Sequence, residues 1–436
     1  MKLKRGQWIT LGIAACGLAI VTVDAVDISY TDLHPGNPMN ASSYAYAVCG
    51  TQQVGAYKTD FKHACLWAGS AFSYVDLSPN GYWDSEALAT TGKQQAGHYY
   101  NPFQQHCAGF WSGSSDSYVS LSAPNASPPG VQDGVVYAIS GAHQVGVATM
   151  LDVNPTAHAA LWSGSISSFV DLNPDASVAR KSYAYACTDS KQGGEIILPS
   201  DAWGSSPHAA LWSGTAASCV DLHPVGAASS VVFGMSDSFQ AGKAVFYIYS
   251  QPHPHAALWS GTAASFVDLN PADPDVTSTA YAACGPLQAG ECRRTGSLHA
   301  VIWSGTAASM VDLHSVLGTN YSESSARGIW TDGTTIRVVG GATYFNGMNH
   351  AMLWTVQGLQ PPAPPPQFHV ASAQNLGGTN VLTLTWTNDT SWSAVEAGSS
   401  ITGGWDTVNT PWMTNGSWVS TTISNTAPSQ FFRLRR

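Results

Sequence analysis

Two pairs of carboxylates have a spacing that could support acid–base chemistry. Asp84 and Glu86 lie two positions apart, and so do Asp273 and Asp275. Alternate residues of a strand point to the same face about 7 Å apart, within the ~5 to 9.5 Å that separates the paired carboxylates of glycoside hydrolases. No neighbouring residue adds support to either pair. A polysaccharide-degrading hydrolase or lyase is therefore the alternative function, and catalytic residues are not assigned.

Aromatic side chains in the variable segments favour binding instead. Rings with few charges around them suit stacking on sugars or gripping a peptide, although they could equally pack against their own loops. The candidate ligand-binding residues are Tyr82, Trp83, Tyr99, Tyr100, Phe103, Trp203, Tyr249, His253, Tyr344 and Phe345.

Three recurring motifs would form the elements that position these residues. His-Ala-x-Leu-Trp, with variants, recurs at intervals of 44 to 51 residues and ends at Trp67, Trp111, Trp162, Trp212, Trp259, Trp303 and Trp354. Val-Asp-Leu-x-Pro has its Asp or equivalent at Asp32, Asp76, Ser120, Asp171, Asp221, Asp268 and Asp312. Gln-x-Gly begins at Gln53, Gln95, Gln144, Gln192, Gln240 and Gln288, and the seventh copy, Val338-Val339-Gly340, lacks the Gln.

Residues that recur in every unit are expected to build the scaffold. A tryptophan can bury ~150 to 250 Å², so the motif tryptophans predict a core between neighbouring units. The motif histidine is predicted to hydrogen-bond to a neighbouring unit, and the motif aspartate to end a strand or turn. No Cys/His set has zinc-finger spacing, and we expect neither a metal nor a cofactor.

A period of about 48 residues with several short β-type runs is typical of the blade of a propeller. The first complete copy divides into strands at residues 44–50, 54–57, 63–67 and 73–77. Both faces of the His-Ala-x-Leu-Trp strand are apolar, which suits a sheet covered on both sides. We therefore predict an all-β fold, with a seven-bladed β-propeller over residues 26–359.

The two ends of the repeat region complement each other. The chain begins with a lone Asp-Leu-x-Pro strand at residues 28–33, and its last copy, at residues 350–354, has no such strand after it. We predict that the N-terminal strand is the outermost strand of the seventh blade, which would remove the open edges of an incomplete ring.

The loops indicate which face of the propeller binds. The turn between the third and fourth strands is Ser-Gly-Thr-Ala-Ala-Ser in three copies, whereas the second-to-third-strand loops and the between-blade loops vary widely. The variable loops share one face, which is the candidate binding surface.

The N-terminus predicts export. Lys2, Lys4 and Arg5 precede an apolar stretch at residues 9–23 and a small-residue cleavage site before residue 26, the pattern of a signal peptide. Lipidation at Cys16 is the alternative. The apolar stretch is shorter than the ~20 residues of a membrane span, so we expect a secreted or cell-surface protein with no transmembrane anchor.

The net charge indicates which partners to expect, and the cysteine spacing indicates one possible disulfide. The net charge is −10, with no basic cluster, which argues against nucleic acid. Cys284 and Cys292 flank a predicted hairpin and could form a disulfide or remain free. We expect a monomer.

A second domain follows the propeller. Residues 360–367 are rich in proline and predict a stiff spacer. Beyond it the repeat disappears, and runs at residues 381–386, 394–397, 417–423 and 430–434 predict a small β-sandwich over residues 368–436.

Over residues 28–359 the three motifs resemble the HAF-type extracellular repeat family of secreted bacterial proteins. Here Ala, Cys, Val or Met replaces the family's Phe, and Asp-Leu-x-Pro replaces Asp-Leu-Gly. Leu382-Thr383-Leu384-Thr385-Trp386 and Phe431-Phe432-Arg433-Leu434 are similar to C-terminal β-domains of secreted proteins from Verrucomicrobia-like bacteria. The resemblance implies export and a propeller but supplies no catalytic residues.

The sequence as a whole predicts a secreted, non-enzymatic binding or surface-interaction module. Its ligand would be a polysaccharide or a peptide bound on the variable-loop face. A purely structural envelope protein is a further alternative.

Overall fold

A computed structural model of the chain describes residues 26–36, 41–79, 84–103, 105–122, 131–150, 156–200, 206–273, 275–294 and 296–359, and seven strands beyond them. Two compact units are present, Met1–Gln360 and Pro361–Arg436. The predicted signal segment at residues 1–25 and the spacer at residues 360–367 lie outside the described residues.

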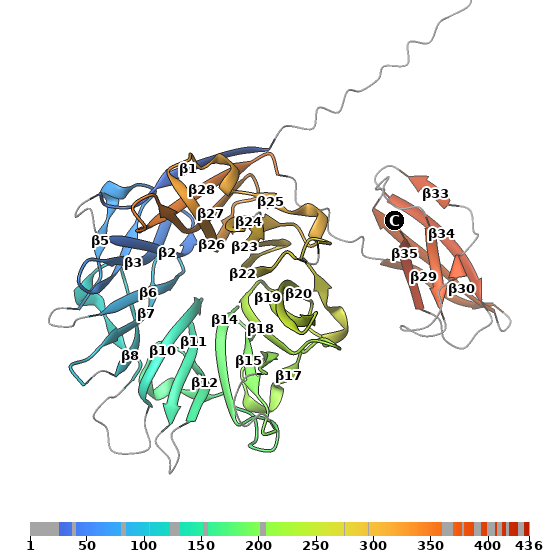
Figure 1. The fold of residues 1–436 in the computed structure, drawn as a ribbon. Coiled ribbons are helices and arrows are strands. Elements are labelled where there is room, and N and C mark those ends of the chain that lie inside the picture. The colour runs from blue at the N-terminus through green and yellow to red at the C-terminus, as the bar shows by residue number, and fades with distance from the viewer. Residues whose placement is uncertain are drawn as a thin grey trace, which may run out of the picture. The chain divides into compact units, whose positions relative to one another are not determined.

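Seven four-stranded antiparallel sheets stand around an axis in the first unit (Figure 1). The first strand of each blade lies innermost and contacts the first strands of both neighbouring blades, and β26 contacts β2 to complete the circle. The predicted all-β, seven-bladed propeller is confirmed.

Blades 1 to 6 each use four consecutive strands. Blade 1 contains β2 (Ser42–Cys49), β3 (Gln52–Lys58), β4 (Lys62–Trp67) and β5 (Val75–Asp76). Blade 2 contains β6 (Ser85–Thr90), β7 (Gln95–Tyr100), β8 (His106–Trp111) and β9 (Val119–Ser120). Blade 3 contains β10 (Val131–Ser140), β11 (His143–Met150), β12 (Thr156–Trp162) and β13 (Val170–Asp171). Blade 4 contains β14 (Lys181–Cys187), β15 (Gln192–Ile197), β16 (His208–Trp212) and β17 (Val220–Asp221). Blade 5 contains β18 (Ser229–Met235), β19 (Gln240–Ile248), β20 (Gln251–Trp259) and β21 (Val267–Asp268). Blade 6 contains β22 (Ser278–Cys284), β23 (Leu287–Arg294), β24 (Ser297–Trp303) and β25 (Val311–Asp312).

Blade 7 joins the two ends of the repeat region. Its sheet has the order β1-β28-β27-β26, with β26 (Tyr321–Thr331), β27 (Thr335–Tyr344), β28 (Asn349–Gln357) and β1 (Asp27–Asp32). Tyr30 lies opposite Trp354 in the antiparallel register. The predicted closure by the N-terminal strand is confirmed.

The fourth strands are shorter than predicted because a 3-10 turn occupies the residues before them. These turns are Ala71–Ser73, Ser115–Ser117, Ile166–Ser168, Ala216–Ser218, Ala263–Ser265 and Ala307–Ser309, and a further one, His314–Val316, follows β25. In each of the first six, a serine in the turn accepts a hydrogen bond from the residue after the motif tryptophan, as Ser73 Oγ does from Ala68 N at 2.7 Å. The predicted strand at 73–77 is thereby reduced to two paired residues.

The motif tryptophans form the core between blades, as predicted. All seven are 0% exposed. Trp67 of blade 1, for example, shares a buried cluster with Val339 and Leu353 of blade 7. Burial of an aromatic side chain of this size is among the largest single contributions to a core.

The motif glutamine secures the turn that leads to the fourth strand. Gln53 Oε1 accepts a hydrogen bond from Gly69 N at 2.8 Å, and the glutamines of blades 2 to 6 make the same contact. In blade 7 the fourth strand comes from the N-terminus, so no such turn follows Trp354. Val338 takes the place of the glutamine there, because blade 7 has no turn glycine whose backbone N–H could donate a hydrogen bond to a glutamine.

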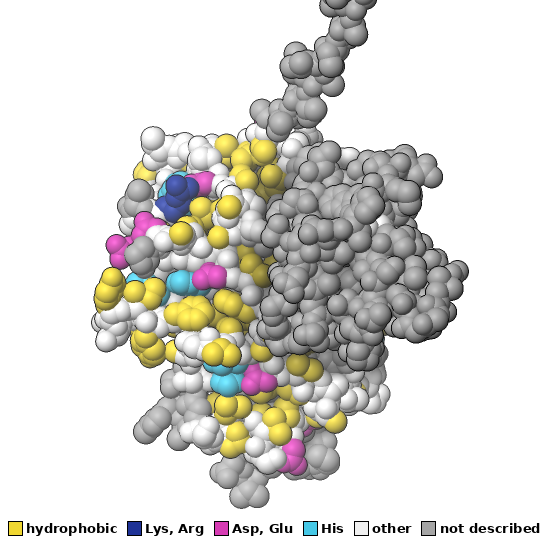
Figure 2. All heavy atoms as spheres, turned by 90° about the vertical axis from the view of Figure 1, so that its right-hand side faces the viewer, with side chains coloured by type: hydrophobic (Ala, Val, Ile, Leu, Met, Phe, Trp, Pro, Cys, Tyr) yellow, Lys and Arg dark blue, Asp and Glu magenta, His cyan; other side chains and the backbone are white. Residues whose placement is uncertain are grey.

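The motif histidine pairs within its own blade, which corrects the prediction of a bond to the neighbouring one. His63 Nδ1 lies 2.9 Å from Asp76 Oδ2, and equivalent contacts of 2.7 to 2.8 Å occur in blades 3 to 7. Antiparallel pairing places the aspartate opposite the residue two positions after the histidine, on the same face. Among the described residues, the motif histidine reaches the next blade only where Ser120 replaces the aspartate, from His106 to Asp133 at 3.1 Å. Figure 2 shows histidine and acidic side chains lying side by side at several levels of the propeller's flank.

The motif aspartate also ends the strand, as predicted. Its second oxygen accepts the backbone N–H two residues on, as Asp171 Oδ1 does from Asn173 N at 2.8 Å.

The seven cysteines of the described part of the chain are all free, so Cys284 and Cys292 form no bridge. Within the described residues, no helix has the length and apolar character needed to cross a membrane.

The second unit contains two antiparallel sheets. One has the order β29-β30-β34-β33 and the other β32-β31-β35. The strands are β29 (His369–Leu376), β30 (Thr379–Thr387), β31 (Ala394–Gly398), β32 (Asp406–Thr407), β33 (Trp412–Asn415), β34 (Trp418–Asn425) and β35 (Phe431–Arg435). Packing of the two sheets into a sandwich depends on side chains outside the described set and stays a prediction.

Candidate functional site

Every blade carries a β-bulge in its first strand, and the bulge aims one side chain into the central channel. In blade 1 the register passes from Ala45 to Ala47 and leaves Tyr46 unpaired. A bulge of this kind redirects the extra residue and interrupts the alternation of faces. The seven residues at this position, here called the bulge ring, are Tyr46, Leu88, Tyr137, Tyr185, Phe233, Tyr281 and Arg327. All seven line one cavity of about 450 Å³.

The glycine of Gln-x-Gly is required by the bulge. A Cβ added to Gly55 would lie 1.7 Å from the carbonyl oxygen of Tyr44, and the equivalent distances in the other blades are 1.8 to 1.9 Å. No Cβ fits at such distances, so the backbone of the bulge can approach only a glycine. This explains why blade 7 keeps Gly340 while it lacks the glutamine.

Five aromatic residues and one arginine give the bulge ring its chemistry. Tyr137, Tyr185, Phe233 and Tyr281 form a continuous arc, with centroid separations of 5.1, 5.8 and 5.5 Å and tilts of 40° to 58°. The Arg327 guanidinium lies 3.8 Å from the centre of the Tyr281 ring, a cation–π contact. The arc is a concave apolar wall that ends in a positive charge.

Carboxylates beside the arc fix its hydroxyl groups. Tyr185 Oη donates to Glu195 Oε1 at 3.0 Å, and Tyr281 Oη donates to Glu291 Oε1 at 2.8 Å. Burial, with the Glu291 charge, raises the pKa of Tyr281 to about 12 against the opposing effect of Arg327. Burial also raises the pKa of Glu195, while Tyr185 and Lys243 oppose this shift. The phenols are therefore fixed hydrogen-bond donors near neutral pH.

A neutral histidine and an ion pair complete the lining on the side of blade 2. Burial, together with His106, lowers the pKa of His98 to about 3, so its imidazole is uncharged near neutral pH. Glu86 forms an ion pair with Lys62 Nζ. Burial lowers the pKa of Lys62, but the pairing with Glu86 outweighs it and the net shift is upward.

The two predicted carboxylate pairs have structural partners. Asp84 Oδ1 accepts the Lys62 backbone N–H at 2.5 Å, and Glu86 pairs with the side chain of the same lysine. Asp273 Oδ1 accepts the backbone N–H of Asp275 at 3.0 Å, which closes a turn. Of these four residues, Glu86 alone lines the channel cavity.

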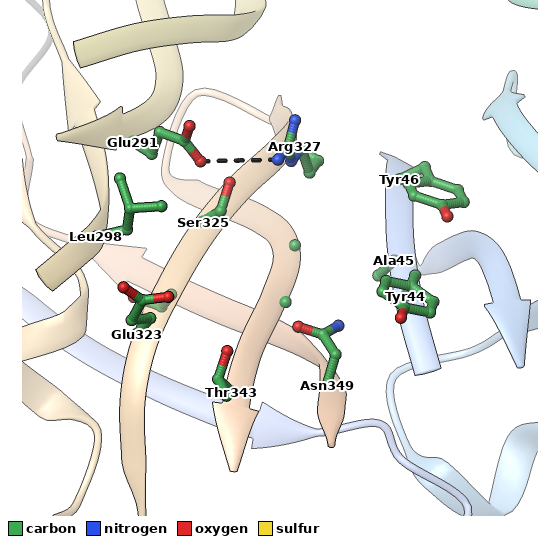
Figure 3. Close-up of a pocket in the computed structure, with 13 residues that line it drawn as sticks. Tyr44, Ala45, Tyr46, Glu291, Leu298, Glu323, Ser325, Arg327, Thr343 and Asn349 are labelled. Atoms are coloured by element: carbon green, nitrogen blue, oxygen red, sulfur yellow. Dashed lines mark ion pairs between the residues drawn. The ribbon is translucent and has the colours of Figure 1, made fainter. Parts of the chain in front are cut away.

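The channel continues into a second hollow beside blade 7. This hollow has a volume of about 410 Å³ and is lined by residues of blades 6, 7 and 1 (Figure 3). Arg327 and Tyr46 line both cavities. Arg327 Nη2 lies 3.7 Å from Glu291 Oε2 across the hollow's wall, as the dashed line in Figure 3 marks.

The predicted ligand-binding residues that the structure describes lie in different surroundings. Tyr100 lines the channel cavity. Tyr344 stacks on His350 at 4.6 Å, Tyr99 packs edge-on against Tyr118 at 5.0 Å, and His253 pairs with Phe246 in the β19–β20 hairpin. Side chains that extend into solvent are Phe103, Tyr249 and Phe345, which are 70%, 88% and 73% exposed. Tyr82, Trp83 and Trp203 lie outside the described residues. Their role in binding stays a prediction.

The bulge ring was missed by the sequence analysis, although a signal was present. In blades 1 to 6 the ring residue stands nine positions before the glycine of Gln-x-Gly, as Tyr46 does before Gly55. This position changes from Tyr to Leu, Phe and Arg between blades while its neighbours stay small. A bulge is not visible in the alternation of polar and apolar residues, so the strand could not reveal which side chain faces the axis.

Comparisons with known proteins find only weak similarity, and only to solved structures. A puromycin-hydrolyzing peptidase of Mycobacterium tuberculosis is 11% identical with a TM-score of 0.46; the match covers 80% of this chain and 58% of that one. Oligopeptidase B of Leishmania major is 9% identical with a TM-score of 0.43, over 81% and 54%. TolB of Acinetobacter baumannii is 9% identical with a TM-score of 0.34, over 73% and 81%. The chain thus spans less than two thirds of the length of the two peptidases. These scores are too low to support a conclusion on activity, and no family model and no curated protein matches the chain.

Proposed function

We propose that the protein is a non-enzymatic binding module that holds a peptide at the variable-loop mouth of the propeller channel. One observation carries this proposal: seven bulges aim side chains of four types, Tyr, Phe, Leu and Arg, at a single cavity, whereas the motif residues around them repeat. A scaffold alone has no need to vary this position.

The shape of the cavity favours a peptide over a polysaccharide. Sugar rings bind on flat, accessible aromatic faces, whereas the arc consists of rings tilted against one another around a concave space. Such a space suits one or two side chains inserted from above, which is how hot-spot residues of a peptide are buried. Exposed loop aromatics such as Tyr249 and Phe345 would contact the rest of the peptide.

Export and membership of the HAF-type repeat family belong to the same proposal. The charged and apolar segments at residues 1–25 support export, and the three motifs support the family resemblance. A peptide-binding propeller outside the cell would act on neighbouring proteins or their fragments.

The test is a binding screen with the full chain. Hexapeptides displayed on phage are selected against it, and a glycan array is probed in parallel. We expect the selected peptides to bind at least tenfold more weakly to Tyr185→Ala and Tyr281→Ala, because a well-buried contact is worth about 1.4 kcal/mol or more.

Phe72→Ala is the matched control for these two variants. Phe72 is an aromatic residue of the turn between β4 and β5, on the opposite face, and is fully exposed. Binding to glycans alone, or equal loss in the Phe72 variant, would contradict the proposed peptide site.

A further inference from the structure

The hollow beside blade 7 exists because this blade carries small residues where the others carry larger ones. Ser325 occupies the strand position held elsewhere by Tyr44, Glu86, Val135, Tyr183, Val231 and Thr279, opposite the residue after the glycine. Gly341 occupies the position of Glu195, Lys243 and Glu291 in blades 4 to 6. A Cβ on Gly341 would lie 2.5 Å from the Asn349 side chain. The space is therefore a property of this blade and not of the repeat.

The hollow holds one unbalanced negative charge. Glu291 is compensated by Arg327 at 3.7 Å and accepts the Tyr281 hydroxyl. Glu323 also lines the hollow, and no side chain among the described residues forms an ion pair or hydrogen bond with its carboxylate. The Ser325 Oγ is buried and likewise has no hydrogen-bond partner in the described part of the chain. A buried polar group costs free energy when it is left unpaired, so Ser325 Oγ is suited to a partner that a ligand supplies. The half-buried Glu323 carboxylate lines the hollow with no counter-charge of its own among the described residues.

Two tyrosine rings lie opposite these carboxylates. Tyr44 and Tyr46 stack at 6.2 Å with an interplanar angle of 11°. Figure 3 shows them across the hollow from Glu291 and Glu323, with Thr343 and Asn349 between. Carboxylates facing aromatic rings are the arrangement that recognises organic cations, through ion pairing on one side and cation–π attraction on the other.

We infer that this hollow binds the cationic side chain of a lysine or arginine in the peptide ligand. The inference rests on the proposed function and adds a selectivity to it. An anionic group would meet Arg327, but it would lie between two carboxylates. A cation gains an ion pair with Glu323 and a hydrogen bond from its own N–H groups to Ser325 Oγ. The net charge of −10 further favours the approach of basic peptides.

The experiment starts from peptides selected on the full chain. We expect lysine or arginine to be enriched at one position. For one selected sequence, three synthetic hexapeptides then carry lysine, Nε-acetyllysine or norleucine at that position, and their dissociation constants are measured by calorimetry. The lysine peptide should bind about tenfold more tightly than the other two, and Glu323→Gln should remove this difference.

A second test variant and a control variant accompany this experiment. Ser325→Tyr fills the hollow with the side chain that blades 1 and 4 carry there, and should weaken the lysine peptide while the protein keeps its melting temperature. Asp237→Asn removes an exposed carboxylate in the β18–β19 turn and should change nothing.

The outcomes separate the two proposals. If peptides bind and acetylation leaves the dissociation constant unchanged, the cation site is wrong and the peptide-binding function stands. If the lysine preference persists in Glu323→Gln, the cation binds elsewhere and the assignment to this hollow is wrong. If no peptide is recovered, both proposals fail.

Discussion

At the scale of the residue, the glycine opposite each bulge connects the repeat motif with the binding site. Gly290, for example, faces the carbonyl oxygen of Thr279 so closely that a Cβ would lie 1.9 Å away. The contact involves backbone, which cannot rotate aside as a side chain can. The glycine therefore determines where the Tyr281 ring points, although it contacts no ligand.

Gly290→Ala should lower the free energy of unfolding by about 3 kcal/mol, at the upper end of the cost of overpacking. Gly318→Ala is the matched control, because Gly318 has no atom within 4 Å of an added Cβ and has no positive φ. Urea denaturation of both variants measures the difference. Equal stability of the two would contradict the role assigned to the bulge.

Residue roles differed in how far the sequence could predict them. The packing of Trp67 and its equivalents followed from size and repetition. The partner of the motif histidine did not, because the aspartate lies 13 residues away from His63 and is brought beside it only by strand pairing. The channel-facing role of Tyr185 was hidden for a related reason, since the bulge changes which alternate residues share a face.

At the scale of the element, the glutamine and the turn after the third strand act as one unit. Gln288 Oε1 accepts from Gly305 N at 2.9 Å, and its Nε2 donates to Pro286 O at 2.8 Å. Blade 7 has neither the glutamine nor the turn. The missing glutamine of the seventh copy is thus a consequence of how the ring closes.

Reciprocal substitutions test this pairing of glutamine and turn. Gln288→Val should cost about 1 to 3 kcal/mol, because it leaves the Gly305 N–H without its acceptor. Val338→Gln should be unfavourable as well, since Val338 is 0% exposed and no turn amide is there to meet the new side chain. Thermal unfolding of both variants is the measurement. A Val338→Gln variant as stable as the parent would disprove the explanation.

At the scale of the whole molecule, stacked histidines link the strand ends in three blades, including the closing one. His34 stacks on His350 at 4.1 Å, and the pairs His223–His208 and His314–His299 stack at 3.8 and 4.3 Å. Burial, with His350, lowers the pKa of His34 to about 4, and burial lowers the pKa of His223 and His314 too. His34, His223 and His314 each lie within 2.8 to 2.9 Å of a serine hydroxyl in the next blade. Blades 3 and 5 have Asn173 and Asn270 at this position, and each accepts a hydrogen bond from the equivalent serine.

Stability should therefore fall as the pH drops from about 6.5 toward 4. These histidines are neutral when folded but protonate near pH 6.5 when unfolded, so the unfolded chain binds more protons in this window and acid favours it. In the triple variant His34→Asn, His223→Asn and His314→Asn, the urea midpoint should change less between pH 7 and pH 4.5. Asp32 and Asp221 are present in both proteins, so the difference between them reports the histidines themselves together with the contribution of His223 to the electrostatics of Asp221. An unchanged pH dependence would refute the prediction.

The overall architecture was the part that sequence could predict best. The period of the three motifs gave the number of blades, and the unmatched strand at residues 28–33 gave the closure. The channel could not be predicted, because its lining depends on how seven first strands meet around an axis. Of the predicted ligand-binding residues that the structure describes, Tyr100 alone lines the channel cavity, since loops and channel wall belong to different parts of each blade.

The pairing of β1 with β28 has a consequence for how the protein is made. Asp27 lies opposite Gln357, so β1 has to wait until β28 is synthesised before it gains its partner. Until then six blades can form, but the ring stays open and presents unpaired edges. A chain interrupted before residue 349 could not complete its seventh sheet. The cell would thus obtain a closed propeller only from messages translated through the entire repeat region, which makes ring closure a physical check on full-length synthesis.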